Sequence, residues 1–466
     1  MAGTAAARPA NPLARIGAAV AALTPSGRAR VPVAWSLYDF ANTIYSYAIV
    51  SYAMGLWITD DARLGAGDGQ LWYGIATAVS VGINAAVSPV LGAMSDRNGR
   101  RLPFLAFFTA QCIIATAAIA LVPTGAGLPA FIGLALFTVA NFSYQAALIY
   151  YDATLPTVSR PQTRGRVSGM GVAIGYLGTL VIAGLILVLG TEDRPPTFLL
   201  SAALFAVFSI PIFLAVRERG SSDYRFQVRD AVASWSQLRT TLAHAREVPG
   251  LLRFLVGRFF YTDPVNTVIV VMAVFAVEAI GLTKAQANLV LLLLTVVAVL
   301  ASFVWGELVE RIGPKRTLLI VLGSWVLGLF IAGSVLSLPT FILGGVLLGS
   351  GLGGVWTSDR VFMLRLSPPD RVGEFFGLYG LAGKFSAVTG PVLYGGTVAL
   401  LLPSLGKGAY QVAIFTFLIL MAIGFVLLRG VPEPHREGAE EFEPTPPPDH
   451  LMPGLEPVGP PREELD

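Results

Sequence analysis

Long apolar runs constrain this chain more than any other feature of its sequence. About 20 consecutive apolar residues are enough to cross the hydrocarbon core of a bilayer as a helix. The chain is 54% hydrophobic and only 13% charged. It should therefore fold as an all-α integral membrane protein, because a helix in lipid satisfies its own backbone hydrogen bonds. We expect twelve spans, at residues 33–58, 72–94, 103–122, 129–151, 167–190, 197–216, 251–278, 286–305, 317–337, 339–364, 374–400 and 409–429.

Lysine and arginine gather in alternate loops between these spans. Short loops rich in these residues stay on the cytoplasmic side of a membrane. The intervening loops hold acidic residues and isolated basic ones, such as Lys284 and Lys407. We therefore expect both termini in the cytoplasm, and the inner membrane as the location if the protein is bacterial. The basic residues behind this prediction include Arg8, Arg15, Arg28, Arg30, Arg97, Arg100, Arg101, Arg160, Arg164, Arg166, Arg311, Lys315 and Arg316.

A short charged segment occurs twice between apolar runs. The first copy, GAMSDRNGRR, covers residues 92–101, and the second, GELVERIGPKR, covers residues 306–316. Both copies begin with a glycine. An acid follows four residues later with an arginine directly after it, then a second glycine, and a pair of basic residues ends the segment. Such a repeat indicates two equivalent halves. The positions that it singles out are Gly92, Asp96, Arg97, Gly99, Arg100 and Arg101, with Gly306, Glu310, Arg311 and Gly313.

The first copy resembles the loop motif of the major facilitator superfamily, which lies between the second and third helices of these transporters. The resemblance implies two pseudo-symmetric six-helix halves with a substrate site near the midplane between them. It also implies that Asp96 contacts the start of the eleventh helix, near Gly373. By symmetry Glu310 would lie at the start of the fifth helix, near Gly165, and the two contacts would form a conformational latch. The alternative is that both loops serve only as positively charged topological anchors.

The first expected span of each half carries the same polar pattern. Asp39 and Asn42 in the first half correspond to Asp263 and Asn266 in the second. An acid inside hydrocarbon is costly, so such a residue usually faces a cavity or a partner. We interpret these residues as groups that bind substrate or a coupling proton. The alternative for Asp39 is a structural ion pair with an arginine at the cytoplasmic rim.

The pentapeptide YDFAN, at residues 38–42, resembles the signature of the vacuole effluxer family. This branch of the major facilitator superfamily includes the fungal vacuolar amino-acid exporter and many bacterial members. Three further stretches are similar to it: RGRVSGMGVAIGYLG at 164–178, RFFYTDPVNT at 258–267 and GEFFGLYGLAGKFSAVTGP at 373–391. The resemblance covers residues 35–400 and implies transport of an amino acid or related solute. Pro264 stands where the resemblance implies a glycine.

Lys384 is placed well inside the eleventh expected span, among small residues. A lysine there must be paired, deprotonated or in contact with water. In one interpretation it binds the carboxylate of a substrate while a nearby acid carries a proton. In the other it forms a buried pair with Asp263 or Asp359 that only fixes packing. We favour the first, because buried pairs contribute little net stability.

The halves are separated and followed by polar segments. We expect a cytoplasmic N-terminal segment at 1–30, the first half at 31–216, a linker at 217–250, the second half at 251–430 and a disordered tail at 431–466. Within the linker, apolar residues share one face of a helix over residues 228–246, which predicts an amphipathic helix on the membrane surface. The tail is rich in proline and glutamate, a composition typical of disorder.

The sequence lacks the residue groupings that enzymes and cofactor sites need. The three histidines, His244, His435 and His450, lie in the linker and tail, and the single cysteine, Cys112, offers neither a disulfide nor a metal cluster. No phosphate-binding glycine loop is present. The net charge of +3 is explained by the loops and does not indicate nucleic acid. We expect no enzyme activity, no cofactor and no metal.

Three functions are compatible with these features. The first is secondary transport of a small organic solute, an amino acid or related carboxylate, driven by proton exchange or by the solute gradient. The second is efflux of amphipathic drugs or toxins through an aromatic lining. The third is a membrane sensor or scaffold that transports nothing. We favour the first, with the lipid bilayer, the solute and protons as partners and a monomer as the working unit. The aromatic residues behind the second are Tyr38, Tyr45, Phe259, Phe260 and Tyr261.

Overall fold

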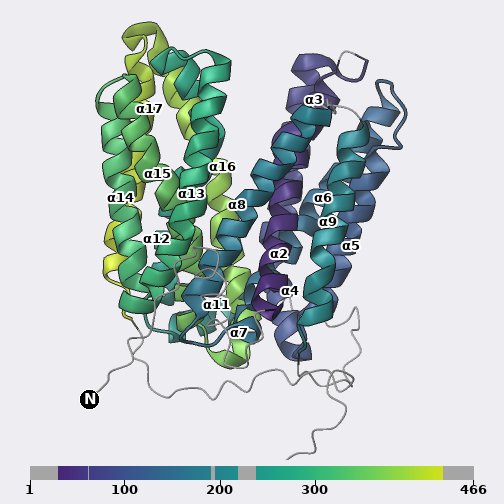
Figure 1. Ribbon diagram of the computed structural model, residues 1–466, viewed down its shortest axis with the longest axis vertical. Helices are drawn as coiled ribbons and strands as arrows, with labels where there is room; N and C mark the ends of the chain where they lie inside the picture. The colour runs from purple at the N-terminus through teal and green to yellow at the C-terminus, as the bar shows by residue number, and fades with distance from the viewer. Residues whose placement is uncertain (1–29, 61, 190–194, 219–237, 434–466) are drawn as a thin grey trace, which may run out of the picture.

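The computed structural model describes residues 30–60, 62–189, 195–218 and 238–433, and the regular structure within these ranges is helical (Figure 1). The predicted N-terminal segment before residue 30, most of the linker and the tail beyond residue 433 lie outside the described residues. The first half contains α2 (Arg30–Tyr45), η1 (Ser46–Ala53), α3 (Met54–Thr59), α4 (Gly65–Asn98), α5 (Leu102–Ile119), α6 (Leu128–Ala153), α7 (Leu155–Val158), α8 (Arg164–Leu189) and α9 (Pro195–Ala215).

The second half repeats this succession of long helices. Its elements are α12 (Leu251–Val274), η2 (Phe275–Ile280), α13 (Lys284–Ile312), α14 (Pro314–Ser334), α15 (Leu338–Leu366), η3 (Pro369–Arg371), α16 (Val372–Leu405) and α17 (Gly408–Arg429). In the described ranges, nine helices are long and apolar enough to cross a membrane, or ten if a pair bent by 51° in α12 and η2 counts as one span. The count of twelve spans remains a prediction.

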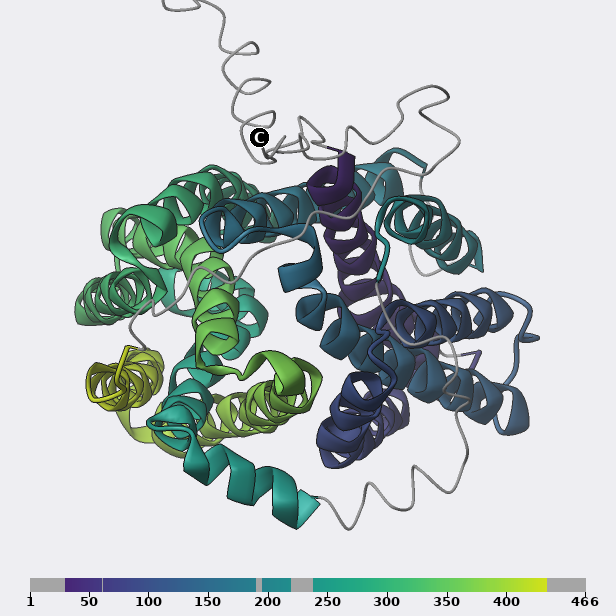
Figure 2. The same ribbon diagram turned by 90° about the horizontal axis from the view of Figure 1, so that it is seen from below.

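Helix packing divides the described residues into two bundles that meet along two seams (Figures 1 and 2). In the first half α2 packs against α8 and α9, and α5 against α6. In the second half α14 packs against α15 and α17, and α12 against α16 and α17. One seam joins α4 to α16, and the other joins α8 to α13 and α15. We call these the α4/α16 seam and the α8/α13 seam.

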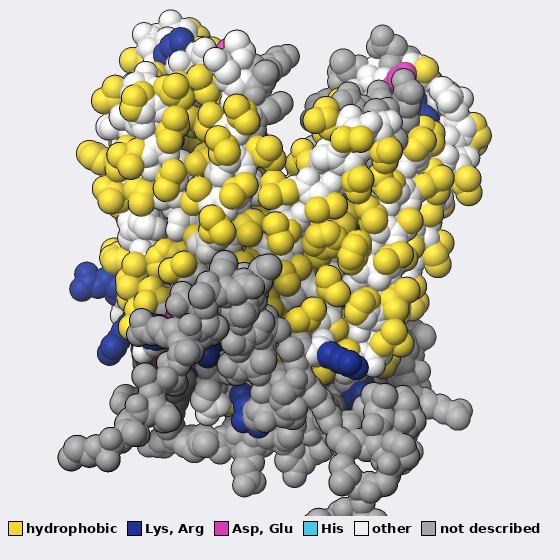
Figure 3. Space-filling view, in the orientation of Figure 1, with side chains coloured by type: hydrophobic (Ala, Val, Ile, Leu, Met, Phe, Trp, Pro, Cys, Tyr) yellow, Lys and Arg dark blue, Asp and Glu magenta, His cyan; other side chains and the backbone are white. Residues whose placement is uncertain are grey.

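The surface of the bundles is apolar over most of its height. Figure 3 shows hydrophobic side chains over both bundles, with most of the visible basic side chains towards the lower end and a few at the upper end. Exposed residues such as Ile114 (68%) and Leu187 (75%) would be unfavourable in water but suit lipid. The same view shows a cleft between the bundles, open at the upper end and closed below. The protein is therefore a multi-pass membrane protein with the two halves parted at one end.

The repeated loop segments end one helix and start the next. Gly99 follows α4 with φ of 61°, and Gly313 follows α13 with φ of 91°. This left-handed region is accessible to glycine at low cost, which explains the second glycine of each copy. Glu218, which follows α9, accepts hydrogen bonds from the backbone N–H groups of Arg101 and Leu102 at 2.7 and 2.8 Å. Its burial raises the pKa of the carboxyl in spite of these two donors.

The part of the predicted linker that the structure describes contains a helix. The helix α11 (Leu238–Glu247) contacts α12 and α16 of the second half and α4 of the first. His244 of α11 lies 3.3 Å from a carboxylate oxygen of Glu374. The remainder of the helix expected over residues 228–246 lies outside the described residues. The linker thus touches both halves at the closed end, near the start of α16.

Candidate functional site

Asp96, near the end of α4, caps the start of α16. Its Oδ1 accepts the backbone N–H of Gly373 at 2.8 Å, and its Oδ2 accepts that of Glu374 at 2.7 Å. The first N–H groups of a helix have no partner within the helix, and the helix dipole favours an anion there. Arg101 approaches the same carboxylate at 3.2 Å. The first half thus holds the second by charge-assisted hydrogen bonds.

Glu310, near the end of α13, makes the corresponding contact in the opposite direction. Its Oε1 accepts the backbone N–H of Gly165 at 2.5 Å and that of Arg166 at 3.3 Å, at the start of α8. Glu307 adds an ion pair with the side chain of Arg166 at 2.7 Å, and Arg311 approaches the same carboxylate at 2.9 Å. Each half therefore supplies one acid that caps a helix of the other. We call the end of the molecule where both contacts lie the motif end.

The first glycine of each loop segment lets the helices of a seam approach closely. A methyl group on Gly92 would overlap the backbone carbonyl of Gly373. A methyl group on Gly306 would lie 2.9 Å from the carbonyl oxygen of Gly165. These are contacts between backbones, so any larger residue would push the helices apart. The spacing of the loop segment thus places a close-packing glycine one helical turn before the capping acid.

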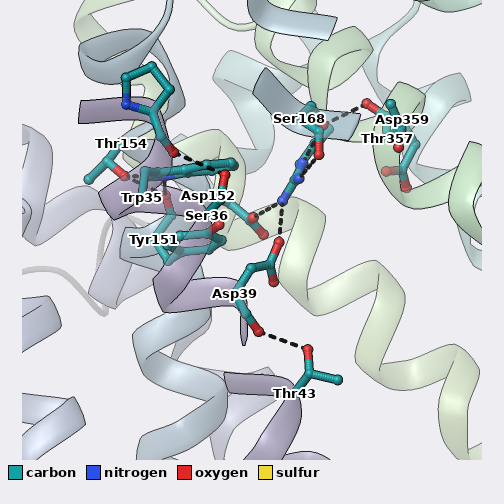
Figure 4. A network of polar contacts seen from close by, with 12 residues as sticks. Trp35, Ser36, Asp39, Thr43, Tyr151, Asp152, Thr154, Ser168, Thr357 and Asp359 are labelled. Carbon is teal, nitrogen blue, oxygen red and sulfur yellow. Dashed lines mark hydrogen bonds and ion pairs between the residues drawn. The ribbon is translucent and has the colours of Figure 1, made fainter. Parts of the chain in front are cut away.

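Arg360 of α15 joins a charged network between the halves (Figure 4). Its Nη1 lies 3.5 Å from Asp39 Oδ2 on α2 and 3.5 Å from Asp152 Oδ1 on α6. Its Nε and Nη2 donate to the hydroxyl and the carbonyl oxygen of Ser168 on α8, both at 2.5 Å. One guanidinium thus contacts three helices of the first half, a use that suits its fixed fork of donors.

Aromatic side chains of the first half pack beside this network. The guanidinium carbon of Arg360 lies 4.9 Å from the ring centroid of Trp35. Trp35 stacks on Tyr151 with 4.4 Å between ring centroids and donates from Nε1 to Thr154 at 3.0 Å. A methyl group on Gly171 would lie 2.7 Å from the Trp35 ring and 3.1 Å from Arg360. This glycine leaves the space that the guanidinium needs.

A second buried pair lies within the second half. Arg258 Nε of α12 is 3.3 Å from Asp359 Oδ2 of α15, and the two side chains are 4% and 0% exposed. Tyr379 of α16 donates to Asp359 Oδ1 at 2.7 Å, and its ring lies 3.5 Å from the guanidinium carbon. Because Asp359 and Arg360 are neighbours in the chain, this pair and the Arg360 network are directly linked.

Lys384 of α16 crosses the α4/α16 seam without contacting an acid. Its ammonium donates to Asn84 Oδ1, and to Ser88 Oγ at 3.0 Å. Asn84 in turn donates to the carbonyl oxygen of Phe142 on α6 at 3.0 Å. Within the described residues, no carboxylate lies within the 4.0 Å of an ion pair with Lys384. The ammonium is thus partly buried and held by neutral oxygens.

Comparison with known proteins identifies the family. A family model described as "Vacuole effluxer Atg22 like" matches residues 73–439. The chain belongs to this family. Its members include autophagy-related protein 22-1 of Penicillium rubens, which is 26% identical over 258 residues, 49% of this chain and 44% of that protein. An uncharacterized MFS-type transporter of Bacillus subtilis, YxiO, is 28% identical over 414 residues, 86% of this chain and 94% of that protein.

Solved structures show the same fold. The human organic anion transporter MFSD10 superposes with a TM-score of 0.68 at 19% identity, over 86% of this chain and 99% of that one. The major facilitator superfamily proton:xylose symporter XylE superposes with a TM-score of 0.65 at 14% identity. The superposition covers 90% of this chain and 97% of that one. The vacuole effluxer chain thus has the fold of major facilitator transporters.

The structure brings some of the predicted residues together and leaves others apart. Asp39 is paired with an arginine, as one of the two interpretations has it, and the arginine belongs to the other half. The pairing of Lys384 with Asp263 or Asp359 is wrong, because its partners are neutral side chains of α4. Asp263 lies on α12 and is 1% exposed, and Asn42, on α2, is 5% exposed.

The remaining predicted positions lie at the motif end or on α12. Asn266 is partly buried one turn beyond Asp263. Arg100 is partly buried at the turn after α4, whereas the side chain of Arg97 is outside the described residues. Arg311 is 71% exposed, so its pairing with Glu307 contributes little.

Sequence reasoning did not select three charged residues of the site: Arg258, Arg360 and Asp152. A signal was available, because Arg258 and Arg360 each stand within an apolar run, where a cation is as costly as an acid. Their partners could not be assigned, since pairing across the halves depends on which face each helix turns to its neighbour.

Proposed function

We propose that this vacuole effluxer family member moves a small solute that bears a carboxylate, an amino acid or related acid, by proton-coupled alternating access. The first support for alternating access is that one end of the molecule is closed while the other is open. The motif end is closed by Asp96 and Glu310, and the cleft opens at the other end. If the motif end is cytoplasmic, as the basic loops predict, this is an outward-facing state. Rocking the halves about their seams would close the cleft and open the motif end.

Lys384 is the observation that carries the choice of a carboxylate. Lys384 is a partly buried residue, lies about 18 Å along α16 from its start, and its ammonium is held by the neutral oxygens of Asn84 and Ser88. A carboxylate replaces such neutral acceptors favourably, because a charge-assisted bond is roughly twice as strong as a neutral one. Binding would release Lys384 from α4, and that release would loosen the α4/α16 seam.

The charges around the site support coupling to a proton. Three acids, Asp39, Asp152 and Asp359, accompany three cations, Arg258, Arg360 and Lys384. A solute carboxylate adds one negative charge to this balanced set. Burying that charge is costly unless a cation enters with it, and a proton on a nearby carboxyl meets the requirement.

Three of the five aromatic residues behind the drug-efflux alternative do not support it, whereas Phe259 and Phe260 are partly exposed. Tyr38, Tyr45 and Tyr261 are 0%, 1% and 0% exposed, and therefore pack inside the bundles and do not line a cleft. Tyr38 shares a hydrogen bond of 2.7 Å with Thr109. The prediction that these three residues form an aromatic lining is wrong.

Transport in proteoliposomes tests the proposal. Labelled amino acids and matched solutes without a carboxylate would be offered with and without a pH gradient. We expect uptake of carboxylate solutes by the native protein, its loss in Lys384→Ala and partial recovery at best in Lys384→Arg, since the planar fork differs from a compact ammonium. Lys407→Ala, an exposed lysine before α17, is the matched control. Undiminished carboxylate uptake by Lys384→Ala would refute the assignment.

A further inference from the structure

The two aspartates of the repeated polar pattern have different surroundings. Asp39 Oδ2 lies 3.5 Å from Nη1 of Arg360. Asp263, at the corresponding place on α12, has no lysine or arginine within 4.0 Å among the described residues. Asp263 is nonetheless a buried residue, 1% exposed, whereas Asp39 is partly exposed. The duplication therefore placed equivalent acids in unequal electrostatic settings.

The carboxyl of Asp263 is enclosed where α12 and α16 touch. A methyl group on Gly390 of α16 would lie 2.7 Å from Asp263 Oδ1 and would overlap the hydroxyl of Thr267. Both Asp263 Oδ1 and the Thr267 hydroxyl are buried without a hydrogen-bond partner in the described structure. Thr267 is one helical turn beyond Asp263, so the two oxygens share the face of α12 that meets Gly390. A small polar site is thus closed off by glycine.

The ionisable groups around this site are engaged elsewhere or uncharged. Arg258 pairs with Asp359, and Lys384 is bound to α4. Tyr394, one turn past Gly390 on α16, is 6% exposed, and its hydroxyl has no partner within the described chain. Besides Asp263, the ionisable side chains on α12, α16 and α17 are Arg253, Arg258, Tyr261, Glu374, Tyr379, Lys384, Tyr394, Tyr410 and Arg429. None of them is within ion-pair distance of Asp263 among the described residues.

We propose that Asp263 is the residue that carries the coupling proton, while Asp39 is a fixed member of the Arg360 ion pair. This inference rests on the proposed transport function. An ionised carboxylate without a cation is strongly disfavoured in such surroundings. A protonated carboxyl is neutral, and its O–H can donate to the nearby threonine hydroxyl after a small rotation. Asp263 therefore holds its proton in the closed α12/α16 contact and releases it to water when that contact opens.

The helix α16 links this site to the proposed carboxylate site. Gly390 and Lys384 are six residues apart, about 9 Å along the helix. A movement of α16 that follows release of Lys384 from α4 also changes the packing of Gly390 on Asp263. Movement of the solute and movement of the proton would be coupled through this one helix, with Asp263 protonated while the solute is bound and one proton moved for each carboxylate.

The experiment compares Asp263→Asn with Asp39→Asn in two transport assays and one spectroscopic assay. In proteoliposomes, we expect Asp263→Asn to exchange solute for solute but to lose accumulation driven by a pH gradient, so that the inside-to-outside ratio falls to about one, the ratio without a driving force. Whatever transport Asp39→Asn retains should still respond to the pH gradient. The assignment would be overturned if Asp263→Asn still accumulated solute in response to the pH gradient. It would also be overturned if a sodium gradient, and not a proton gradient, drove accumulation by the native protein.

Infrared spectroscopy reads the proton directly and does not depend on transport. The spectrum of the native protein minus that of Asp263→Asn at neutral pH should contain the C=O band of a protonated carboxylic acid. Asparagine has the shape and charge of the protonated acid, so Asp263→Asn should melt at the native temperature, whereas Asp39→Asn should melt lower. A missing band or a large fall in the melting temperature of Asp263→Asn would contradict the proposal. If the band is present but the native protein shows no flux, the transport function fails and the proton site stands.

Discussion

Replacing Asp96 by asparagine should shift the protein from the state described here towards one that is open at the motif end. Asparagine has nearly the same shape but no charge and only one acceptor oxygen. It can keep one of the two hydrogen bonds to α16, at Gly373 or at Glu374. The contact exists only while the motif end is closed, so its loss acts on the equilibrium between states.

The size of the effect follows from these two bonds. A hydrogen bond to a charged group contributes roughly 1.5–3 kcal/mol and a neutral one roughly 0.5–1.5 kcal/mol, and the helix dipole adds about 0.3–1 kcal/mol for an anion. The Asp96 side chain is 9% exposed, so solvent screens these interactions only weakly. We expect a loss of about 1–3 kcal/mol, which changes the ratio of the two states roughly 5- to 150-fold.

Distances between spin labels at the motif end measure this ratio. Cysteines introduced at Gln162 in the first half and Asp370 in the second are exposed at that end. The single native cysteine, Cys112, is buried and would not react. Pulsed electron resonance in lipid nanodiscs should give mainly the short distance for the native chain and a larger long-distance population for Asp96→Asn.

Two controls isolate the helix cap. Asp68→Asn makes the same chemical change in the first turn of α4, at the other end of the helix, and should leave the distances unchanged. Arg101→Gln removes the ion pair but leaves the cap, and should have a smaller effect. An unchanged distance distribution in Asp96→Asn, with normal expression, would show that the loop is only a topological anchor.

Three further changes test the seams and the charged network. Glu310→Gln should shift the same label distances in the same direction but less, because one of its two bonds is already long at 3.3 Å; an effect of opposite sign would contradict the symmetry. Gly92→Ala should also favour the open motif end by forcing backbones apart, whereas Gly82→Ala, which has open space around it, should not; equal effects of the two would refute the packing argument. Arg360→Met should lower the free energy of unfolding in detergent, by at most about 3–5 kcal/mol, because it leaves the partly buried acids Asp39 and Asp152 without a cation, and an unchanged melting temperature would contradict the ion-pair assignment.

The seam contacts could be predicted because the loop segment resembles the motif of the major facilitator superfamily, and this resemblance implies which helix the acid contacts. The spacing from Gly92 to Asp96 places both residues at the end of α4, and the duplicated segment does the same for Gly306 and Glu310. The helices, however, run beyond the apolar runs, since α4 covers Gly65–Asn98 where the sequence predicts a span at 72–94. The apolar pattern indicates which residues lie in the hydrocarbon layer, but it does not indicate where the helix begins and ends.

The partners within the membrane could not be predicted in the same way. Arg360 and Lys384 were both visible as charges in apolar runs, but a helix there is apolar on nearly all sides, so the face turned to the other half carries no periodic signal. Lys384 has Asn84 and Ser88 as its partners. These are neutral polar residues, and the sequence contains many others of the same type. The π-helical stretch Ser46–Ala53 inside the first span likewise has no marker in its sequence.

The reciprocal capping of the seams bears on how the two halves arose. An acid of the first half caps α16 of the second, and an acid of the second caps α8 of the first, at matching places in the repeat. Two identical six-helix chains related by a two-fold axis would form both contacts at once, because residue i of each would meet residue j of the other. A self-complementary dimer of an ancestral half would thus already have possessed both seams. Joining two such halves in one chain would require only a linker, and the equivalent aspartates of the two halves could then take different roles.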